Sequence, residues 1–406
     1  MGGSSSSQQA DQSETPTYFT QEELSKLKSE FETGGVEKIK PLLEKKVKEL
    51  DNTELNIAVT GDSGAGKSTF INAMRGLRKQ DEGAAAVGTT ETTMEPTGYP
   101  HPNLPNVRYW DLPGIGSTRF TAGSYLKKMQ LKKYDFFIIV AVNRFTENDA
   151  KLAKEIKRLG KEFYFVRSKI DADLDSMRQQ QTTFDEDAEM EKIRSDCVSQ
   201  LGKAGIPDPT VFLISSFKKN MYDFPHLIKS LGAGLPNVKE SVFVLALPNL
   251  SVEIIRKKGE VLKKRIWMWA IISGGVGAIP VPGLSAACDM GILIAAVIDF
   301  RKCLCLNDAA LRRLAEKTSK SVEELKAAAQ SSLLEEITAQ VIVRLRLGAV
   351  AVTVSAIEAA LYVAPGVGSV FGAGSSFLMT YMILNDALKL LMETAEKVLA
   401  VAKGAH

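Results

Sequence analysis

The chain has little of the chemistry that builds a zinc module or a disulfide scaffold. Only four cysteines and three histidines occur among its 406 residues. Neither zinc-ligand spacing nor disulfide density is found among Cys197, Cys288, Cys303 and Cys305. This scarcity argues against both kinds of site and predicts a reducing compartment.

An excess of charge of one sign is also lacking. The 51 Lys and Arg residues are nearly matched by 48 Asp and Glu, which leaves a net charge of +3. Such a balance argues against a dedicated nucleic-acid-binding protein. With 45% hydrophobic and 24% charged residues, the composition is that of a globular protein. The length suits about two to three domains.

The first residues lack the apolar core of a secretory signal. They read Met1-Gly2-Gly3-Ser4-Ser5-Ser6, which matches the M-G-x-x-x-[ST] pattern for N-myristoylation of Gly2. A disordered tail over residues 1–19 that is never acylated is the alternative, and the pattern leaves both open. Because one myristoyl chain binds a membrane only weakly, stable anchoring would need a second signal downstream.

Residues 61–68, GDSGAGKS, fit the phosphate-loop pattern G-x-x-x-x-G-K-[ST]. A β-prone run, Leu55–Thr60, precedes the loop, and Ser68–Gly76 has apolar residues at helical spacing. Lys67 is expected to bind the β- and γ-phosphates, and the Ser68 hydroxyl to bind Mg²⁺. The predicted phosphate contacts come from Gly61, Asp62, Ser63, Gly64, Ala65, Gly66, Lys67, Ser68 and Thr69.

Strand and helix patterns alternate from residue 55 to about residue 231, which predicts a doubly wound α/β domain. The further strands are expected at Val107–Leu112, Asp135–Val142, Phe163–Ser168 and Val211–Ser215, with helices at Asn148–Leu159 and Glu186–Leu201. In such sheets, ligands bind at the carboxyl ends of the strands. The remaining nucleotide motifs all fall at those ends.

The first of these motifs is D-x-x-G at Asp111–Gly114. Asp111 is expected to hold Mg²⁺ through water, and the Gly114 N–H to face the γ-phosphate. Small Ras-like GTPases place a glutamine after this glycine to orient the attacking water, whereas this chain has Ile115. The substitution predicts slow hydrolysis by the chain alone.

Two motifs concern the base. Ser168-Lys169-Ile170-Asp171 resembles the [NT]-K-x-D motif of GTPases, with Ser in the first place. Asp171 would accept hydrogen bonds from guanine N1 and N2, which adenine cannot reciprocate, while Lys169 would lie along the base and brace the phosphate loop. Ser215-Ser216 would offer a backbone N–H to guanine O6. Together these motifs favour GTP over ATP.

A first switch is expected between the phosphate loop and Asp111, in residues 88–94, GTTETTM. One of its threonines should reach Mg²⁺. Thr93 is the preferred candidate, and Thr89 and Thr90 are alternatives. An ordinary polar loop is the competing interpretation, because this assignment rests on order along the chain.

The chain resembles the immunity-related (interferon-inducible) GTPases. The resemblance is carried by residues 56–76, 89–94, 101–118, 134–145, 163–174 and 222–225, among them DLPGIGST and FYFVRSKID. It implies a Ras-like P-loop domain, a helical domain built from N- and C-terminal segments, and dynamin-like, nucleotide-dependent oligomerisation. It also implies residence on endomembranes or pathogen-containing vacuoles. Lys67 places the chain with the lysine-containing (GKS) subgroup, and Glu91 occupies the position of a glutamate that supports hydrolysis across a dimer interface.

The helical segments are expected on both sides of the GTPase domain, which is assigned to residues 51–235. Within residues 20–50, Thr20 and Glu23 form a capping box, Gly34-Gly35 breaks the helix, and Val36–Leu50 resumes it. These polar helices should pack on the C-terminal helices of residues 236–406.

The C-terminal segment has two stretches without a charged residue. The first runs from Ile266 to Cys288, and the second runs from Ala359 to Asn385. Glycines and prolines interrupt both stretches, which favours two broken helical hairpins over continuous membrane spans. The hairpins form either a buried core or a shallow membrane insertion. Basic and aromatic residues border the first stretch, namely Arg256, Lys257, Lys258, Lys263, Lys264, Arg265, Trp267 and Trp269. Such a border suits lipid headgroups, and a charged, solvated helix face explains the basic residues almost as well.

These patterns, with the resemblance, predict a cytoplasmic GTPase that is peripheral on membranes, binds GTP or GDP with Mg²⁺ and acts in innate defence. Its expected partners are copies of itself, in a GTP-dependent homodimer or oligomer, or other family members. Lys67, Thr93 and Glu91 are the predicted catalytic residues. Nucleic acid is not an expected partner. A nucleotide-gated membrane scaffold with little or no turnover is the alternative.

Overall fold

The apolar run at the centre of the sheet is buried on both of its faces. In the computed structural model, which describes residues 21–88, 95–114, 128–180, 183–276, 284–349 and 375–404, this run forms β4 (Phe136–Ala141), and all six of its residues are buried. Every second residue beginning with Phe136 packs on one face of the sheet, and every second residue beginning with Phe137 packs on the other face. Because side chains alternate along a strand, a strand covered on both faces must be apolar throughout.

Within the described ranges, six strands form one sheet in the order β2-β3-β1-β4-β5-β6. Around β4, the strands are β1 (Leu55–Thr60), β2 (Thr97–Pro100), β3 (Val107–Asp111), β5 (Glu162–Arg167) and β6 (Val211–Leu213). All neighbouring pairs are parallel except β2 with β3. The sequence did not predict the edge strand β2, because a four-residue TGYP segment with Gly and Pro carries almost no strand propensity.

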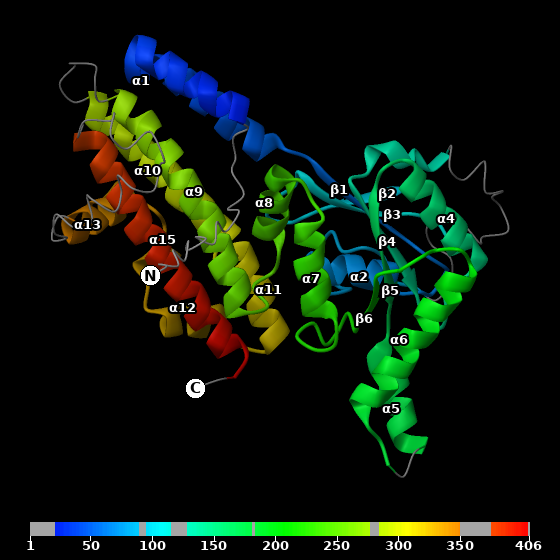
Figure 1. Cartoon of the computed structure of the whole chain (residues 1–406). Helices are drawn as coiled ribbons and strands as arrows, with labels where there is room; N and C mark the ends of the chain where they lie inside the picture. The colour runs from blue at the N-terminus through cyan, green and yellow to red at the C-terminus, as the bar shows by residue number, and fades with distance from the viewer. Residues whose placement is uncertain are drawn as a thin grey trace, which may run out of the picture.

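Helices cover both faces of the sheet, which confirms the doubly wound α/β prediction (Figure 1). One face packs against α2 (Lys67–Met74), α7 (Phe224–Ala233) and α8 (Asn237–Ala246). The other packs against α4 (Glu147–Arg158), α5 (Ile170–Gln180) and α6 (Glu186–Lys203), and a 3₁₀ turn, η1 (Leu131–Lys133), precedes β4. We call the sheet with these helices, α8 excepted, the α/β part.

The predicted strands and helices of this part are confirmed to within two residues at their ends. The last strand is shorter than predicted, since β6 ends at Leu213 and the chain turns at Ser215. Helix α5 was not predicted, because Ile170 and Asp171 had been assigned to a loop motif rather than to the first turn of a helix.

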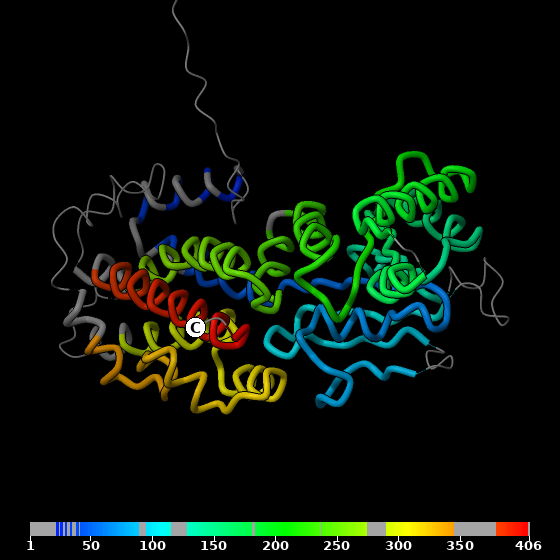
Figure 2. The backbone as a smooth tube through the Cα atoms, turned by 90° about the horizontal axis from the view of Figure 1, so that it is seen from below, coloured from blue at the N-terminus to red at the C-terminus, as the bar shows by residue number. Residues whose placement is uncertain are grey.

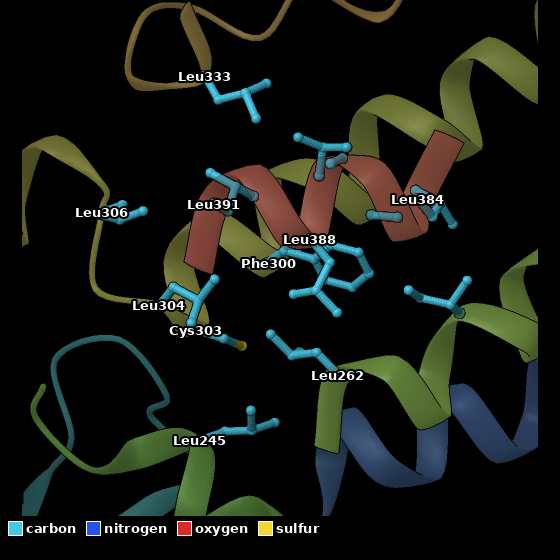
Figure 3. Close-up of a cluster of buried hydrophobic side chains, with 14 of the residues drawn as sticks. Leu245, Leu262, Phe300, Cys303, Leu304, Leu306, Leu333, Leu384, Leu388 and Leu391 are labelled. Atoms are coloured by element: carbon cyan, nitrogen blue, oxygen red, sulfur yellow. The ribbon is translucent and has the colours of Figure 1, made fainter. Parts of the chain in front are cut away.

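The remaining helices form a separate bundle, which we call the helical part (Figures 1 and 2). It consists of α1 (Gln21–Asn52), α9 (Val252–Val276), α10 (Leu284–Cys303), α11 (Asp308–Thr318), α12 (Val322–Ala329), η2 (Ser332–Leu334), α13 (Ala339–Ala349) and α15 (Ser375–Ala402). Its core joins N- and C-terminal segments, as the resemblance implied. Figure 3 shows Leu262 of α9, Phe300 of α10 and Leu388 of α15 meeting at the centre of this core.

The predicted break at Gly34-Gly35 is wrong, because α1 is one helix of 32 residues that continues to Asn52. Ile39, Leu43 and Val47 recur at helical spacing and are buried in the same cluster as α9. Burial of this stripe offsets a helix penalty of about 1 kcal/mol for each glycine. The predicted packing of this segment on the C-terminal helices is confirmed. Thr20, the expected cap, lies outside the described residues.

The described portions of the two apolar stretches lie in α9, α10 and α15. Ile266, Ile271 and Ile383 are buried in the helical core, and Ser273 shares a hydrogen bond of 2.8 Å with Thr380 across α9 and α15. The Gly- and Pro-containing turns at 277–283 and 359–374 fall outside the described residues. Among the residues that the structure describes, no helix is sufficiently long and apolar to cross a membrane.

Two members of the predicted basic border face the protein interior, so for them both the headgroup and the solvated-face interpretations are wrong. Lys258 is 0% exposed, and its ammonium donates to Asn249 Oδ1 at 3.0 Å and to the Cys303 carbonyl at 2.8 Å. Arg265 is also buried and pairs with Asp51 at 3.1 Å. Helical spacing alone did not reveal which positions turn inward. The nearby Trp267 and Trp269 pack, half-buried, against the helical core.

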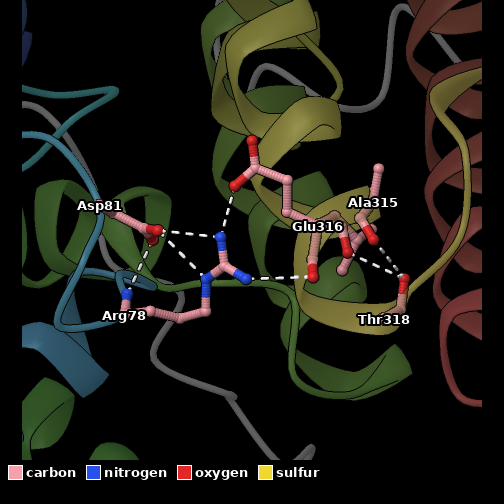
Figure 4. Close-up of polar contacts among 6 residues, drawn as sticks. Arg78, Asp81, Ala315, Glu316 and Thr318 are labelled. Carbon is pink, nitrogen blue, oxygen red and sulfur yellow. Dashed lines mark hydrogen bonds and ion pairs between the residues drawn. The ribbon is translucent and has the colours of Figure 1, made fainter.

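The two parts meet at the amino edge of the sheet, the edge at which the parallel strands begin. There the Arg78 guanidinium contacts the Asp81 carboxylate at 3.1 Å, the Glu316 carboxylate, and the Glu316 carbonyl at 3.0 Å (Figure 4). Helix α8 belongs to both parts, since Val242 lies in the core against the sheet and Leu245 lies in the helical core. The boundary predicted at residue 236 therefore falls at the start of a shared helix.

Candidate nucleotide-binding site

The predicted phosphate loop connects the carboxyl end of β1 to the start of α2. Gly61 opens the loop with φ 135°, and a Cβ there would lie 1.9 Å from the Val140 carbonyl oxygen. Gly114 approaches from the end of β3, where a Cβ would lie 2.8 Å from the Gly61 oxygen. Only glycine fits such close approaches of backbone to backbone. The two segments predicted to contact phosphate are thus in direct contact.

Lys67 begins α2 and turns its side chain back over the loop. The residue is 9% exposed, and Nζ donates to the Gly61 oxygen at 2.9 Å and to the Asp62 oxygen at 3.0 Å. The first N–H groups of a helix have no acceptor within the helix and attract anions. The ammonium and the start of α2 therefore concentrate positive charge at one place, as a phosphate chain requires.

Ser68 and Asp111, the residues predicted to manage Mg²⁺, are in contact. Ser68 Oγ donates to Asp111 Oδ2 at 2.9 Å, although 43 residues separate them in sequence. The β1–β3 register pairs Val59 with Asp111, which places the carboxylate beside the start of the phosphate loop. A hydroxyl and a carboxylate are oxygen ligands of the kind that Mg²⁺ prefers. This donor set fits the ion, which when bound would neutralise charge on the β- and γ-phosphates.

The predicted base motif binds the phosphate loop through two side chains. Ser168 Oγ donates to the Ala65 oxygen at 2.6 Å, and Lys169 Nζ donates to the Gly64 oxygen at 3.0 Å. Lys169 adopts a left-handed backbone conformation with φ 59°. Lys169 thus braces the loop in the way expected of it. The carboxyl ends of β1 and β5 are thereby tied together.

Asp171 lies half-buried in the first turn of α5. That turn is held by Arg167, whose guanidinium contacts Asp173 Oδ2 at 2.6 Å and donates to the Ser168 oxygen at 3.3 Å. Burial raises the pKa of the Asp173 carboxyl, an effect that the Arg167 charge opposes. This ion pair was not predicted from the sequence. The signal was an arginine that ends an apolar strand directly before the motif.

Ser215 and Ser216 follow β6, which is the parallel neighbour of β5. Ser215 is fully buried, and its Oγ accepts hydrogen bonds from the N–H groups of Phe217 at 3.2 Å and Lys218 at 3.1 Å. The hydroxyl therefore shapes the turn, and Ser216 lies half-buried at its start.

A second carboxylate beside the phosphate loop was also missed. Asp149 forms a capping box with Thr146 at the start of α4, accepting from the Thr146 N–H at 2.8 Å. Burial raises the pKa of the Asp149 carboxyl, and the charge of Asp62 in the phosphate loop raises it further. The signal in the sequence was the capping pattern T-x-x-D directly after the strand.

The predicted switch residues lie outside the described part of the chain. This applies to Thr89, Thr90, Glu91 and Thr93, and to Ile115 after the D-x-x-G glycine. Their assignments remain predictions from the sequence.

Comparison with known proteins bears directly on this arrangement. The family model described as "Interferon-inducible GTPase (IIGP)" matches residues 20–395. The chain belongs to the interferon-inducible GTPase family. It is 38% identical over 390 residues to Interferon-inducible GTPase 5 of Rattus norvegicus, an alignment that covers 95% of this chain and 83% of the relative. It is 39% identical to Interferon-inducible GTPase 1 of Mus musculus over 314 residues, covering 77% and 76% of the two chains.

Among solved structures, a variant of Era from Aquifex aeolicus bound to GDP·AlF4⁻ matches 53% of this chain and 67% of its own, with a TM-score of 0.30 and 17% identity. NFeoB from S. thermophilus, bound to GDP·AlF4⁻ and K⁺, matches 70% of this chain and 98% of its own, with a TM-score of 0.31 and 15% identity. Family membership by sequence implies guanine-nucleotide binding, GTP hydrolysis in general and an immunity-related function.

Proposed function

We propose that this interferon-inducible GTPase hydrolyses GTP with Mg²⁺, slowly alone and faster when copies pair in a nucleotide-dependent way. The observation that carries the proposal is the contact of Ser68 with Asp111 beside the Lys67 ammonium. A carboxylate and a hydroxyl at one phosphate loop form a metal–phosphate site rather than a generic anion site. Thr93 is the proposed further Mg²⁺ ligand, and the Gly114 N–H the donor to the γ-phosphate.

Selection of guanine is proposed for the segments that follow β5 and β6. Asp171 would accept from guanine N1 and N2, and the Ser215-Ser216 turn would donate a backbone N–H to O6. The bonds from Ser168 and Lys169 to the phosphate loop support this assignment, since they hold the base motif at a fixed place relative to the phosphates. Adenine presents the opposite pattern of donors and acceptors, so it would leave the Asp171 carboxylate and the backbone N–H of the turn without partners on the base.

Turnover is proposed to depend on a second copy of the chain. Ile115 stands where small GTPases carry the glutamine that orients water, and an isoleucine cannot hydrogen-bond a water. Glu91 is the proposed substitute, acting across the interface between two GTPase domains.

Association with membranes is the remaining part of the proposal. Gly2 lies in a myristoylation pattern, and family membership favours action in cell-autonomous defence on endomembranes or pathogen-containing vacuoles. A single acyl chain would need support from the helical part or from oligomerisation for stable binding.

A nucleotide-gated scaffold with little turnover is the second candidate. Ile115 favours it, because a protein without a water-orienting group can bind GTP and hold the bound state. In that case the bound nucleotide would recruit partners, and hydrolysis would serve only to end the signal.

The deciding experiment measures GTP turnover per molecule against protein concentration for the parent chain and for Glu91→Ala. The control is Glu95→Ala, since Glu95 is the next acidic residue along the chain and is exposed. We expect specific activity to rise with concentration in the parent and the control. Glu91→Ala should lose that rise while still binding GTP, and EDTA should abolish turnover in all three proteins. Flat activity in the parent at every concentration would favour the scaffold.

A further inference from the structure

Phe217 is an aromatic residue left in water beside the base motif. Its exposed fraction is 79%, whereas the other exposed large hydrophobic residues among those described lie between 36% and 49%. Burial of a phenylalanine side chain is favourable, and the chain without a ligand lacks that stabilisation here. A bound molecule that covers the ring would recover it.

The exposure does not come from a loosely held segment. Ser215 Oγ accepts from the Phe217 N–H, and Lys219 Nζ donates to the Ala73 oxygen of α2 at 3.0 Å. At the far end of the segment, Asp223 Oδ2 accepts from the Leu213 N–H at 2.7 Å. The backbone that carries Phe217 is therefore anchored before and after the ring, and the side chain is presented from a fixed position.

Contacts on both sides place this position next to the proposed guanine site. The Ile170 N–H donates to the Ile214 oxygen at 3.2 Å, which joins the start of α5 to the end of β6. Lys218 Nζ lies 4.0 Å from Asp175 Oδ2, one turn beyond Asp171 on α5. Phe217 thus belongs to the turn that runs alongside the first turn of α5, where Asp171 would bind the edge of the base.

We propose that Phe217 is a base-covering residue, whose ring lies against the flat face of the bound guanine. This inference deepens the proposed function and rests on the guanine-nucleotide site assigned there. The two residues would contribute different parts of base recognition. Asp171 reads the edge of the base and supplies identity, while an aromatic face binds any purine and supplies affinity.

A second exposed apolar residue of the same segment provides a matched control. Met221 is 45% exposed and lines a hollow of about 490 Å³ between the segment and α6, together with Met190 and Tyr222. None of the residues lining that hollow belongs to the proposed nucleotide site. Met221 is therefore not expected to contact the base, and loss of its side chain should not expose the base.

The first test measures the dissociation constant for GDP in the full chain, the Phe217→Ala variant and the Met221→Ala variant by titration calorimetry. Stacking of a base on an aromatic ring contributes about 1–3 kcal/mol, so Phe217→Ala should weaken GDP binding by about 5- to 150-fold. Met221→Ala should bind like the parent, and Phe217→Tyr should restore most of the affinity. Inorganic tripolyphosphate, which has no base, should bind the parent and Phe217→Ala equally well.

Several outcomes would overturn the inference. GDP affinity of Phe217→Ala within twofold of the parent would show that the ring does not touch the base. If Phe217→Ala binds GDP and tripolyphosphate more weakly by the same factor, Phe217 maintains the shape of the site and does not contact the base. If the parent binds tripolyphosphate as tightly as GDP, the guanine site itself fails, and this result is separable from the failure of Phe217 alone.

A second measurement does not depend on how well the alanine variant folds. In Phe217→Trp the indole would lie against the base, so its fluorescence should change on addition of GDP and stay unchanged on addition of tripolyphosphate. Met221→Trp controls for the three native tryptophans and for general effects of binding. An equal response of both variants to GDP would contradict contact between Phe217 and the base.

Discussion

The carboxyl and amino edges of the same sheet both carry buried charged and polar groups, but they use them differently. At the carboxyl edge, the buried Lys67 and Ser168 and the exposed Lys169 donate mainly to backbone oxygens of the phosphate loop. Asp62, Ser63 and Gly64 of that loop are exposed, so a ligand can reach these groups from solvent.

At the amino edge, the groups bind one another beneath the helical part. His101 Nδ1 accepts from the Asn103 and Leu104 N–H groups at 3.3 Å, and Asn103 Nδ2 lies 3.6 Å from Cys305 Sγ. Lys258 Nζ approaches the same sulfur at 3.5 Å. These bonds join β2 and β3 to α9 and to the end of α10.

The difference teaches that a buried lysine marks a ligand site only where its surroundings open to solvent. Lys67 and Lys258 are both buried and both donate to carbonyl or amide oxygens. Lys67 stands at the start of a helix beside an exposed glycine loop, whereas Lys258 is enclosed on every side. Removal of Lys67 should thus impair function, and removal of Lys258 should impair stability.

The largest expected effect is that of Lys67→Ala. Loss of one charged donor to a transferring phosphoryl group lowers turnover by about 10²- to 10³-fold, and nucleotide affinity should fall with it. Thermal unfolding without nucleotide should change little, because water can enter beside the exposed Asp62, Ser63 and Gly64 and take the place of the Lys67 ammonium. Hydrolysis assays and melting curves of the same preparation check both halves. A variant that melts far below the parent would contradict the contrast between the two edges.

The next effect concerns pH and the amino edge. Burial, with the charge of Lys258 adding to it, lowers the pKa of His101 from 6.5 to about 3. The folded chain therefore binds fewer protons than the unfolded chain between these values, so stability falls as the pH falls below 6.5 and stops falling near 3. From pH 6.5 to about 4.5 the loss from this group should be about 2–2.5 kcal/mol.

The measurement for His101 is urea unfolding at several pH values for the parent and for His101→Asn. An asparagine oxygen can accept the same two N–H groups but does not titrate, so the difference in slope between the two proteins isolates the imidazole. Nucleotide affinity should follow the fraction folded and show no separate dependence on His101. Parallel slopes in the two proteins would mean that His101 binds protons equally in the folded and unfolded chains, so that burial does not lower its pKa.

The smallest effect is that of Lys258→Met, which keeps the length of the side chain and removes its donors. Asn249 Oδ1 and the Cys303 oxygen would lose a buried partner, which should destabilise the chain by about 2 kcal/mol. Nucleotide affinity should stay within twofold of the parent, and the exposed neighbour Lys257→Met should change neither property. Unchanged stability would show that burial of the charge costs as much as its hydrogen bonds return.

The fold could be predicted well where the pattern is local. The strand β4 was recognisable from its apolar run, and β1 with the phosphate loop from spacing. The edge strand β2 and the continuity of α1 could not be predicted, because pairing with β3 and packing against α9 outweigh the weak propensities of their own residues. Helix α5 was not predicted, because its first residues, Ile170 and Asp171, were assigned to a base-recognition loop.

By itself, the sequence determined the chemistry of the site: a lysine and a serine at a helix start, an aspartate at the end of one strand and a second aspartate after another. Backbone geometry at such short range follows from residue type and spacing. Only the tertiary structure decided which residues meet, because the contact of Ser68 with Asp111, the burial of Lys258 and the exposure of Phe217 all depend on segments far apart in the chain. Burial is a property of the packed whole, and one residue's neighbours in sequence do not reveal it.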